Sequence, residues 1–266
     1  MIEDHWTLSR RAFANTPDPS FVYRSAAFAE GFARLVYDAT ELRGGLSLIT
    51  GEIGCGKTML AQALADGLAD SPCDVIAVPY PKITPTQMLA SVARGIGLDP
   101  PPRGKLAVIM ALGARLAALH RDGRRPVLVV DEAQLASPSL LEEIRLLTNF
   151  EDRQDKHLHV VLLGQPELRE RVRRRPQIDQ RVSLRFHVEP MEPDDVRGYV
   201  EHRLRVAGWS GGEMFTDAAM TTLAARSGGV PRRVNTLATQ ALFVGAMRQL
   251  TRIDAELMTD VADDQE

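Results

Sequence analysis

The chain has 266 residues, of which 44% are hydrophobic and 25% charged, and its formal net charge is −3. These values are typical of a globular protein with one large or two modest domains, and they give no overall bias toward nucleic acid or anionic membranes. Two cysteines are too few for a disulfide framework, the first residues are too polar for a signal peptide, and no apolar run is long enough to span a membrane. We expect a cytoplasmic protein.

Residues 1–44 are predicted to form an N-terminal arm and a first helix that pack on the core domain that follows them in the sequence. The stretch Thr16–Ser20 is rich in turn residues and leads into Phe21 and Tyr23. Ser25 is a candidate helix N-cap, and the apolar residues after it share one helical face. The glycines at positions 44 and 45 are predicted to end this helix.

A strand, a glycine-rich loop and a helix follow. The apolar run 46–50 predicts a strand, the pattern G-x-x-x-x-G-K-[ST] occupies 51–58, and a helix begins at Lys57. Such a loop turns its backbone N–H groups toward a phosphate chain, and the helix N-terminus adds positive charge there. We predict that Lys57 contacts the β- and γ-phosphates and that Thr58 holds Mg²⁺. The predicted nucleotide-binding residues of this segment are Gly51, Glu52, Gly54, Cys55, Gly56, Lys57, Thr58 and Met59.

Two further side-chain groups have open interpretations beside this loop. Phe21 or Tyr23 either packs within the protein or closes over the adenine base. Cys55 either fills the loop as a small side chain, which we favour, or is a redox-sensitive thiol, since helix N-termini lower the pKa of thiols.

Four more strands with intervening helices complete an α/β core over residues 45–189. Apolar runs predict three of these strands, of which the continuous run 127–130 suits a strand buried on both faces of a parallel sheet. A period of two predicts that the last is an edge strand with one wet face. These strands cover 74–79, 127–130, 159–163 and 182–188. Helical patterns in the core cover 57–69, 85–95, 105–120 and 138–150. From residue 190 onward only helical patterns occur, so residues 190–266 are predicted to form a helical lid domain.

Two carboxylates, Asp131 and Glu132, directly follow the strand 127–130. Ligands of open α/β sheets bind at the C-terminal ends of the strands. We predict that Asp131 holds Mg²⁺ and that Glu132 orients or deprotonates the water that attacks the γ-phosphate. The alternative is a pair of solvated acids. The phosphate loop upstream favours a hydrolytic site.

Three more polar features have both structural and functional interpretations. Gln165 either touches the γ-phosphate and the attacking water or only turns the chain into the next helix. The arginines between positions 169 and 181 either form a solvated helix face, bind DNA phosphates through 171–175, or supply Arg181 as an arginine finger to a neighbouring subunit. Arg232, at a helix start in the lid, is either an exposed charge or a phosphate contact.

Seven motifs in chain order resemble AAA+ ATPases of the general secretion pathway protein A (ExeA/GspA) type. They lie at 16–25 (TPDP-x-F-x-Y-x-S), 49–58 (the glycine loop), 131–134 (DEAQ), 162–168 (LLGQPEL), 180–181 (QR), 202–208 (HRL-x-x-AG) and 229–235 (G-x-PR-x-[IV]N). The resemblance implies a P-loop NTPase (AAA+) three-layer sandwich with a five-stranded parallel sheet in the order 5-1-4-3-2 and a C-terminal helical lid. It also implies that Gln165 is sensor 1, Arg181 the arginine finger and Arg232 sensor 2.

The resemblance further implies an ATPase that binds ATP and Mg²⁺ between subunits, and two uses of it stay open. In the first, ATP drives ring or helical homo-oligomers that remodel or release a protein partner, as in the secretion type. In the second, ATP assembles a platform on DNA, as in related transposition regulators of the TniB/MuB kind. A passive nucleotide binder would require Glu132 to be idle. Secretion-type members often continue into a membrane span and a peptidoglycan-binding domain, neither of which we expect in this chain.

Overall fold

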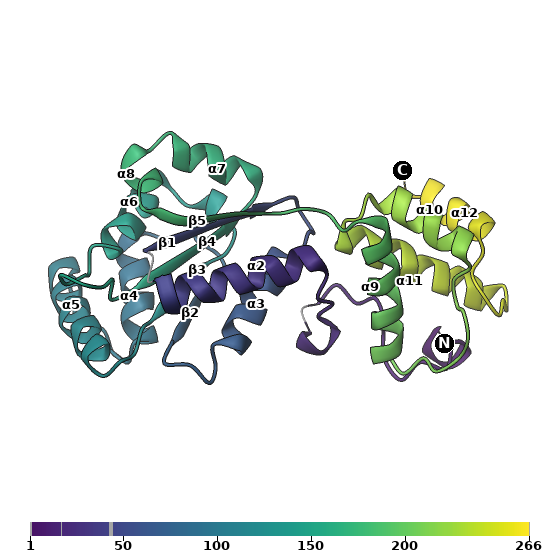
Figure 1. The fold of residues 1–266 in the computed structure, drawn as a ribbon, viewed down its shortest axis with the longest axis horizontal. Coiled ribbons are helices and arrows are strands. Elements are labelled where there is room, and N and C mark those ends of the chain that lie inside the picture. The colour runs from purple at the N-terminus through teal and green to yellow at the C-terminus, as the bar shows by residue number, and fades with distance from the viewer. Residues whose placement is uncertain (1, 17, 43–44, 266) are drawn as a thin grey trace. The chain divides into compact units, whose positions relative to one another are not determined.

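The structure, a computed structural model, describes residues 2–16, 18–42 and 45–265. The chain folds as two compact units (Figure 1). The α/β unit comprises residues 30–53 and 57–188. The helical unit comprises the N-terminal residues up to Ala29, the short segment Gly54–Gly56 and the residues from Glu189 onward. Each unit has its own buried apolar core.

Five parallel strands form one sheet in the α/β unit, in the order β2-β3-β4-β1-β5. The strands are β1 (Leu46–Gly51), β2 (Val75–Val78), β3 (Val127–Val130), β4 (His159–Gly164) and β5 (Val182–Val188). This order is the predicted 5-1-4-3-2 read from the opposite edge. The predicted fold class and strand order are therefore confirmed.

Burial along the strands follows their positions in the sheet. Every residue of β1, β3 and β4 is buried, because these strands lie inside the sheet and are covered on both faces. β5 is an edge strand, and Ser183 and Arg185 on its wet face are exposed as the alternating pattern predicts.

Helices cover both faces of the sheet and make three layers. The elements of this unit are α2 (Ala26–Tyr37, of which the first turn groups with the helical unit), the π-helical turn η2 (Asp38–Leu42), α3 (Lys57–Gly67), α4 (Pro85–Gly95), α5 (Lys105–Arg121), the 3₁₀ turn η3 (Ala133–Leu135), α6 (Pro138–Leu147), α7 (Pro166–Arg173) and α8 (Pro176–Asp179). Residues of α4, α5, α6, α7 and α8 share one core with alternate residues of the strands. On α3, a Cβ added at Gly67 would come within 2.7 Å of the ring of Phe32 in α2, so these two helices pack directly together.

Local sequence signals explain several helix ends. Thr84 and Gln87 form a complete capping box before Pro85, as the Thr-Pro pair predicts. Ser137 accepts a hydrogen bond from the Leu140 N–H at the start of α6. The predicted helix 138–150 ends at Leu147, because the following residues continue as turns with hydrogen bonds to the third preceding residue. The helix predicted from Ser25 begins at Ala26, and the glycine predicted to end it at position 44 lies outside the described residues.

The helical unit holds the C-terminal helices and the N-terminal residues in one core. Its elements are α1 (Ile2–His5), the 3₁₀ turn η1 (Pro19–Phe21), α9 (Pro193–Val206), α10 (Asp217–Ser227), α11 (Pro231–Met247) and α12 (Ala255–Asp263). Trp6 donates from Nε1 to the Leu242 carbonyl over 2.8 Å, and Arg203 donates from Nε to the Ala12 carbonyl over 2.6 Å. Phe21 is 5% exposed and lies under the Arg203 guanidinium, which favours the packed interpretation of its ring.

The N-terminal arm therefore differs from the expectation. Residues 1–44 were predicted to pack on the α/β core, but the described residues up to Ala29 belong to the helical unit and only those from Glu30 on belong to the α/β unit. The reason is that the arm's aromatic residues, Trp6, Phe13 and Phe21, are buried in the helical core. Pro17 of the arm lies outside the described residues.

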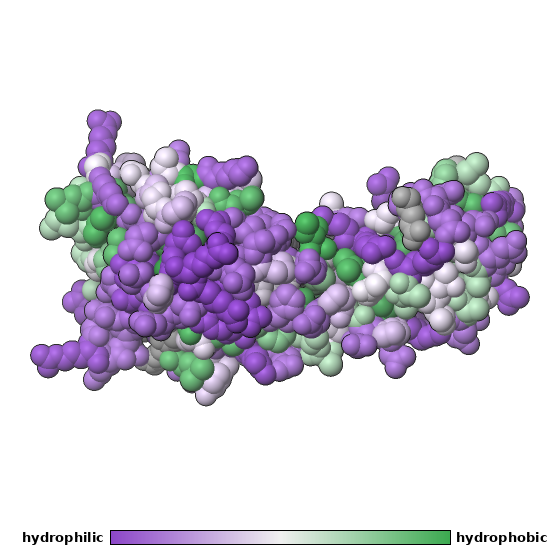
Figure 2. All heavy atoms as spheres, turned by 90° about the horizontal axis from the view of Figure 1, so that it is seen from above, coloured by the Kyte–Doolittle hydropathy of each residue, from purple (hydrophilic) through white to green (hydrophobic). Residues whose placement is uncertain are grey.

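Among residues 2–16, 18–42 and 45–265, the structure contains no helix with the length and apolar character needed to cross a membrane. Figure 2 shows that one face of the molecule is mostly hydrophilic, with apolar residues in small groups.

Candidate nucleotide-binding site

The glycine loop between β1 and α3 adopts a backbone that its glycines make possible. Gly54 and Gly56 have φ angles of +86° and +95°, a region that residues with a side chain rarely adopt. A Cβ added at Gly56 would meet no heavy atom within 4 Å, so space is open in front of it. The loop is therefore a turn with room beside it, as binding of phosphates requires.

Lys57 is the first residue of α3, and its side chain returns into the loop. Its ammonium group donates to the Gly51 carbonyl over 2.7 Å and to the Glu52 carbonyl over 2.8 Å, and the residue is only 6% exposed. A buried ammonium and the N-terminus of α3 thus present positive charge at the same place.

Thr58 and Asp131 come together from distant parts of the sequence. The Thr58 hydroxyl donates to Asp131 Oδ2 over 2.7 Å, and the Glu132 N–H donates to Asp131 Oδ1 over 2.8 Å. The Asp131 N–H donates to the Val78 carbonyl of β2, which fixes its backbone at the end of β3. A hydroxyl and a carboxylate in contact are oxygen donors of the kind that Mg²⁺ prefers. This donor set fits the predicted metal site.

Glu132 has an unusual backbone conformation for a residue with a side chain. Its φ is +50° and its ψ 35°, in the left-handed region, where strain often accompanies a functional role. Its carboxylate accepts a hydrogen bond from the side-chain amide of Gln134. Glu132, which directly follows the metal-binding candidate Asp131, thus stands in a left-handed turn with its carboxylate held by Gln134.

Gln165 lies beside the loop strand, as the strand order predicts. It follows Gly164, which pairs with Thr50 in the register of β4 and β1. Gln165 is the N-cap residue of α7, but its side chain makes no capping hydrogen bond. Its backbone N–H donates to the side-chain oxygen of Gln134 over 3.1 Å.

Gln134 therefore connects two of the predicted site residues, and sequence reasoning assigned it no role. Its side-chain amide donates to the Glu132 carboxylate and accepts from the Gln165 N–H. Its backbone carbonyl accepts a hydrogen bond from the guanidinium of Arg171. Arg171 also donates to the Ala136 carbonyl. The signal was present in the DEAQ motif, where an amide stands two residues after the predicted catalytic carboxylate.

The arginine-rich stretch has mixed surroundings. Arg171 is partly buried against the DEAQ segment, and burial first, then Arg175, lowers the pKa of its guanidinium below the ordinary value. Arg175 donates to the Arg171 carbonyl over 2.8 Å. Arg169, Arg173 and Arg174 are exposed. Two of the arginines within 171–175 thus serve the fold, and the others form a solvated surface.

Arg181 lies at the opposite end of the sheet from the loop. It precedes β5, whose first residue pairs with Leu46 at the start of the parallel strand β1. The loop begins where β1 ends, which at ~3.3 Å per residue is ~16 Å along the strand. Arg181 donates to the Thr148 hydroxyl over 3.4 Å. The structure therefore does not bring Arg181 together with Lys57 of the same chain.

Arg232 belongs to the helical unit and begins α11 with Pro231. The segment Gly54–Gly56 groups with this unit, and the Arg232 N–H donates to the Gly54 carbonyl over 3.3 Å. A Cβ at Gly54 would come within 2.7 Å of the Arg232 Cβ. Cys55 in the same segment is 5% exposed, which favours its interpretation as a small packing residue.

A parallel five-stranded sheet in this order, with a glycine loop after β1 and Thr58 bonded to Asp131 after β3, defines a P-loop protein of the AAA+ class. Residues 41–172 match the model of the AAA domain family. The chain is 36% identical over 251 residues to general secretion pathway protein A of Aeromonas hydrophila, which covers 93% of this chain. It spans 45% of that relative's length, or about half. Residues 41–172 of this chain thus carry an AAA domain, and the chain is similar to general secretion pathway protein A.

Solved structures share the fold over nearly the whole chain. The ORC2 protein of Aeropyrum pernix, solved in ADPNP–ADP complexes, has a TM-score of 0.70 at 16% identity, covering 97% of this chain and 72% of that one. The ORC1 protein of Aeropyrum pernix, solved in complex with DNA, has a TM-score of 0.67 at 22% identity, covering 97% of this chain and 70% of that one. The chain thus shares its fold with both of these proteins.

Proposed function

We propose that this chain binds ATP with Mg²⁺ and hydrolyses it to ADP and phosphate at an interface between two of its subunits. The observation that carries the proposal is the hydrogen bond from the Thr58 hydroxyl to Asp131, next to the buried ammonium of Lys57. Mg²⁺, when bound, supplies positive charge that offsets the negative charge of the phosphates.

Phosphate binding, metal binding and activation of water are carried by different residues in this proposal. The loop N–H groups and Lys57 bind the phosphate chain, and Thr58 and Asp131 hold the metal. Glu132 accepts a proton from the attacking water, and Gln165 orients that water from the end of β4. Gln134 positions Glu132 relative to Gln165 through its two hydrogen bonds.

Arg181 acts on the site of a neighbouring subunit in this proposal. Its position before β5, ~16 Å of strand away from its own loop, supports action in trans. A guanidinium there offsets charge that develops on the γ-phosphate. Arg232 reports the nucleotide state to the helical unit, and its contact with Gly54 supports that role.

The assembly driven by ATP is a ring or helical homo-oligomer that remodels a protein partner. The similarity to general secretion pathway protein A supports a secretion-type role. A second candidate is an ATP-assembled platform on DNA, as in transposition regulators, and the exposed side chains of Arg169, Arg173 and Arg174 support it. The two-cysteine composition supports a cytoplasmic location in either case.

The test is the steady-state ATPase rate and the sedimentation of the full chain, with and without duplex DNA. We expect Mg²⁺-dependent hydrolysis and larger species with ATP. DNA stimulation that falls steeply with salt would favour the DNA platform over the secretion-type role. Hydrolysis no faster than that of Lys57→Ala would overturn the proposed ATPase.

A further inference from the structure

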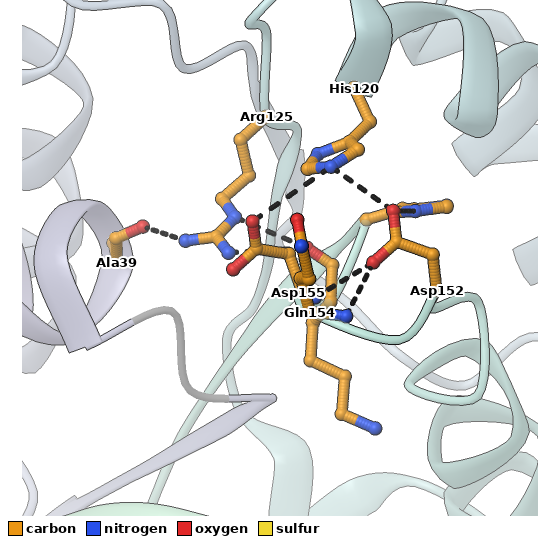
Figure 3. Close-up of polar contacts among 8 residues, drawn as sticks. Ala39, His120, Arg125, Asp152, Gln154 and Asp155 are labelled. Atoms are coloured by element: carbon orange, nitrogen blue, oxygen red, sulfur yellow. Dashed lines mark hydrogen bonds and ion pairs between the residues drawn. The ribbon is translucent and has the colours of Figure 1, made fainter.

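Two histidines and an aspartate come together at the N-terminal ends of the inner strands β3 and β4, away from the phosphate loop at the C-terminal end of β1. Figure 3 shows His120 and Asp152 of this cluster. His120 lies in the last turn of α5, and Asp152 and His157 lie in the loop that leads into β4. The ligand atoms of these three residues all lie within 4.8 Å of one another. These three residues follow no Cys/His metal spacing in the sequence. The fold alone brings His120 to Asp152 and His157.

Two distances within this cluster match those between ligands of one metal ion. Asp152 Oδ2 lies 3.4 Å from His120 Nε2 and 3.3 Å from His157 Nε2. Ligands ~2.0–2.1 Å from a tetrahedral Zn²⁺ lie about 3.3–3.4 Å from each other. Asp155 offers a further carboxylate oxygen, 3.9 Å from His120 Nε2.

Asp152 is held so that one oxygen faces both histidines. Its Oδ1 accepts the backbone N–H groups of Gln154 over 2.8 Å and Asp155 over 2.9 Å. These two hydrogen bonds, and then the one with His157, hold the pKa of Asp152 well below its ordinary value. Because Oδ1 is occupied by the two backbone N–H groups, Oδ2 is left for the cluster.

The loop that carries Asp152 and His157 is tied to the rest of the unit. Arg125 donates from Nε and Nη2 to the Lys156 carbonyl over 3.3 and 3.2 Å, and from Nη1 to the Ala39 carbonyl over 2.9 Å (Figure 3). The His157 N–H donates to the Phe150 carbonyl over 2.8 Å. The cluster is thus built on a braced loop, with His157 itself buried.

We propose that His120 Nε2, Asp152 Oδ2 and His157 Nε2 bind a divalent transition-metal cation, with Zn²⁺ as the ion of choice and Asp155 or water in the fourth position. Imidazole nitrogens suit Zn²⁺, whereas Mg²⁺ and Ca²⁺ prefer oxygen ligands. The C-terminal carbonyls of α5, whose last turn holds His120, favour a cation there. Because the site lies away from the phosphate loop, the metal is structural and fastens the end of α5 to the loop before β4.

Titration of the chelator-treated full chain with Zn²⁺ tests this site, with excess Mg²⁺ and ATP present to occupy the oxygen donors of Thr58 and Asp131. We expect one Zn²⁺ per chain and a rise in Tm. Asp152→Asn, at an exposed position, should keep the fold and weaken binding by about tenfold or more. His157→Gln should abolish it, and His5→Gln, outside the cluster, should bind as the wild type does.

Substituting Co²⁺ for Zn²⁺ reports the coordination geometry of the bound ion through its visible absorption. We expect the visible absorption of a four-coordinate ion in the wild type and in His5→Gln, and its loss in Asp152→Asn and His157→Gln. Zn²⁺ binding equal in the wild type and Asp152→Asn would overturn the proposal. Binding that needs cation on the order of millimolar would also overturn it, and the cluster would then be only a set of hydrogen bonds between the two histidines and Asp152.

Discussion

The two ends of the parallel sheet carry opposite kinds of chemistry. At the C-terminal end, the loop after β1 and the N-terminus of α3 present N–H groups and the Lys57 ammonium, which suit an anion. At the N-terminal end, the last turn of α5 and the loop before β4 present His120, Asp152 and His157, which suit a cation. The same sheet thus supports an anion site and a metal site because its helices begin at one end and finish at the other.

The two ends also differ in how the sequence encodes them. The phosphate loop is contiguous in the sequence, so its spacing reveals it. The histidine cluster instead joins the end of α5 to a loop that follows three intervening elements, β3, η3 and α6. Substitutions at each end can break or sharpen this contrast, because each should affect the chemistry of its own end.

Lys57→Ala should act at the earliest step, because hydrolysis and assembly both require bound ATP. Loss of the ammonium from the loop removes charged hydrogen bonds to the phosphates worth about 3 kcal/mol or more, so ATP affinity should fall by about a hundredfold or more. Equilibrium binding of a fluorescent ATP analogue measures this. Lys82→Ala, at an exposed lysine, is the matched control. Unchanged ATP affinity in Lys57→Ala would falsify the assignment of the phosphate loop.

Glu132→Gln should keep ATP affinity and lower kcat by about 10²–10⁴, because the amide cannot accept the proton of the attacking water. Single-turnover hydrolysis measures the rate, and sedimentation with ATP should detect larger assemblies than in the wild type. Glu167→Gln, an exposed carboxylate in α7, is the control. Full turnover in Glu132→Gln would rule out a catalytic role for this residue.

Arg181→Ala should bind ATP normally and lower kcat by about 10³ or more, since an arginine finger acts on the transition state. Steady-state hydrolysis over a range of ATP concentrations separates kcat from KM. Arg185→Ala, at the fourth residue of β5 and on its exposed face, is the control. Normal turnover in Arg181→Ala would mean that another arginine, or none, serves as the finger.

Gln134→Ala should have the smallest effect at this end of the sheet. It removes the hydrogen bonds that hold Glu132 relative to Gln165, so kcat should fall by between about threefold and a hundredfold with little change in KM. Asp152→Asn, at the other end of the sheet, should leave kcat unchanged. Equal kcat values for Gln134→Ala and the wild type would show that Gln134 does not position the catalytic carboxylate.

Much of the fold follows from the sequence because its signals are local. The continuous apolar run 127–130 identifies β3 as an inner strand, the alternating pattern identifies β5 as an edge, and the loop motif identifies β1. The apolar run of β2 does not show that this strand lies at the other edge. The location of the arm was wrong in the sequence interpretation, because aromatic residues such as Trp6 and Phe13 carry no mark of which core buries them. The cluster of His120, Asp152 and His157 was missed because its members share no spacing.

In the candidate site too, the sequence can place some residues, whereas other contacts require the structure. Asp131 could be placed from the sequence, since it directly follows a strand. The hydrogen bonds of Gln134 could not, because they depend on the left-handed turn at Glu132 and on the distance between β3 and the start of α7. Side-chain networks of this kind require three-dimensional positions rather than patterns.

The measurement that tests the account most directly is ATP hydrolysis by a mixture of the Arg181→Ala and Lys57→Ala proteins. Each protein alone should be nearly inactive, the first for lack of the finger and the second for lack of bound nucleotide. The mixture should hydrolyse ATP, because Lys57→Ala subunits supply Arg181 to the intact loops of their neighbours. A mixture as inactive as its components would contradict a nucleotide site that two subunits complete.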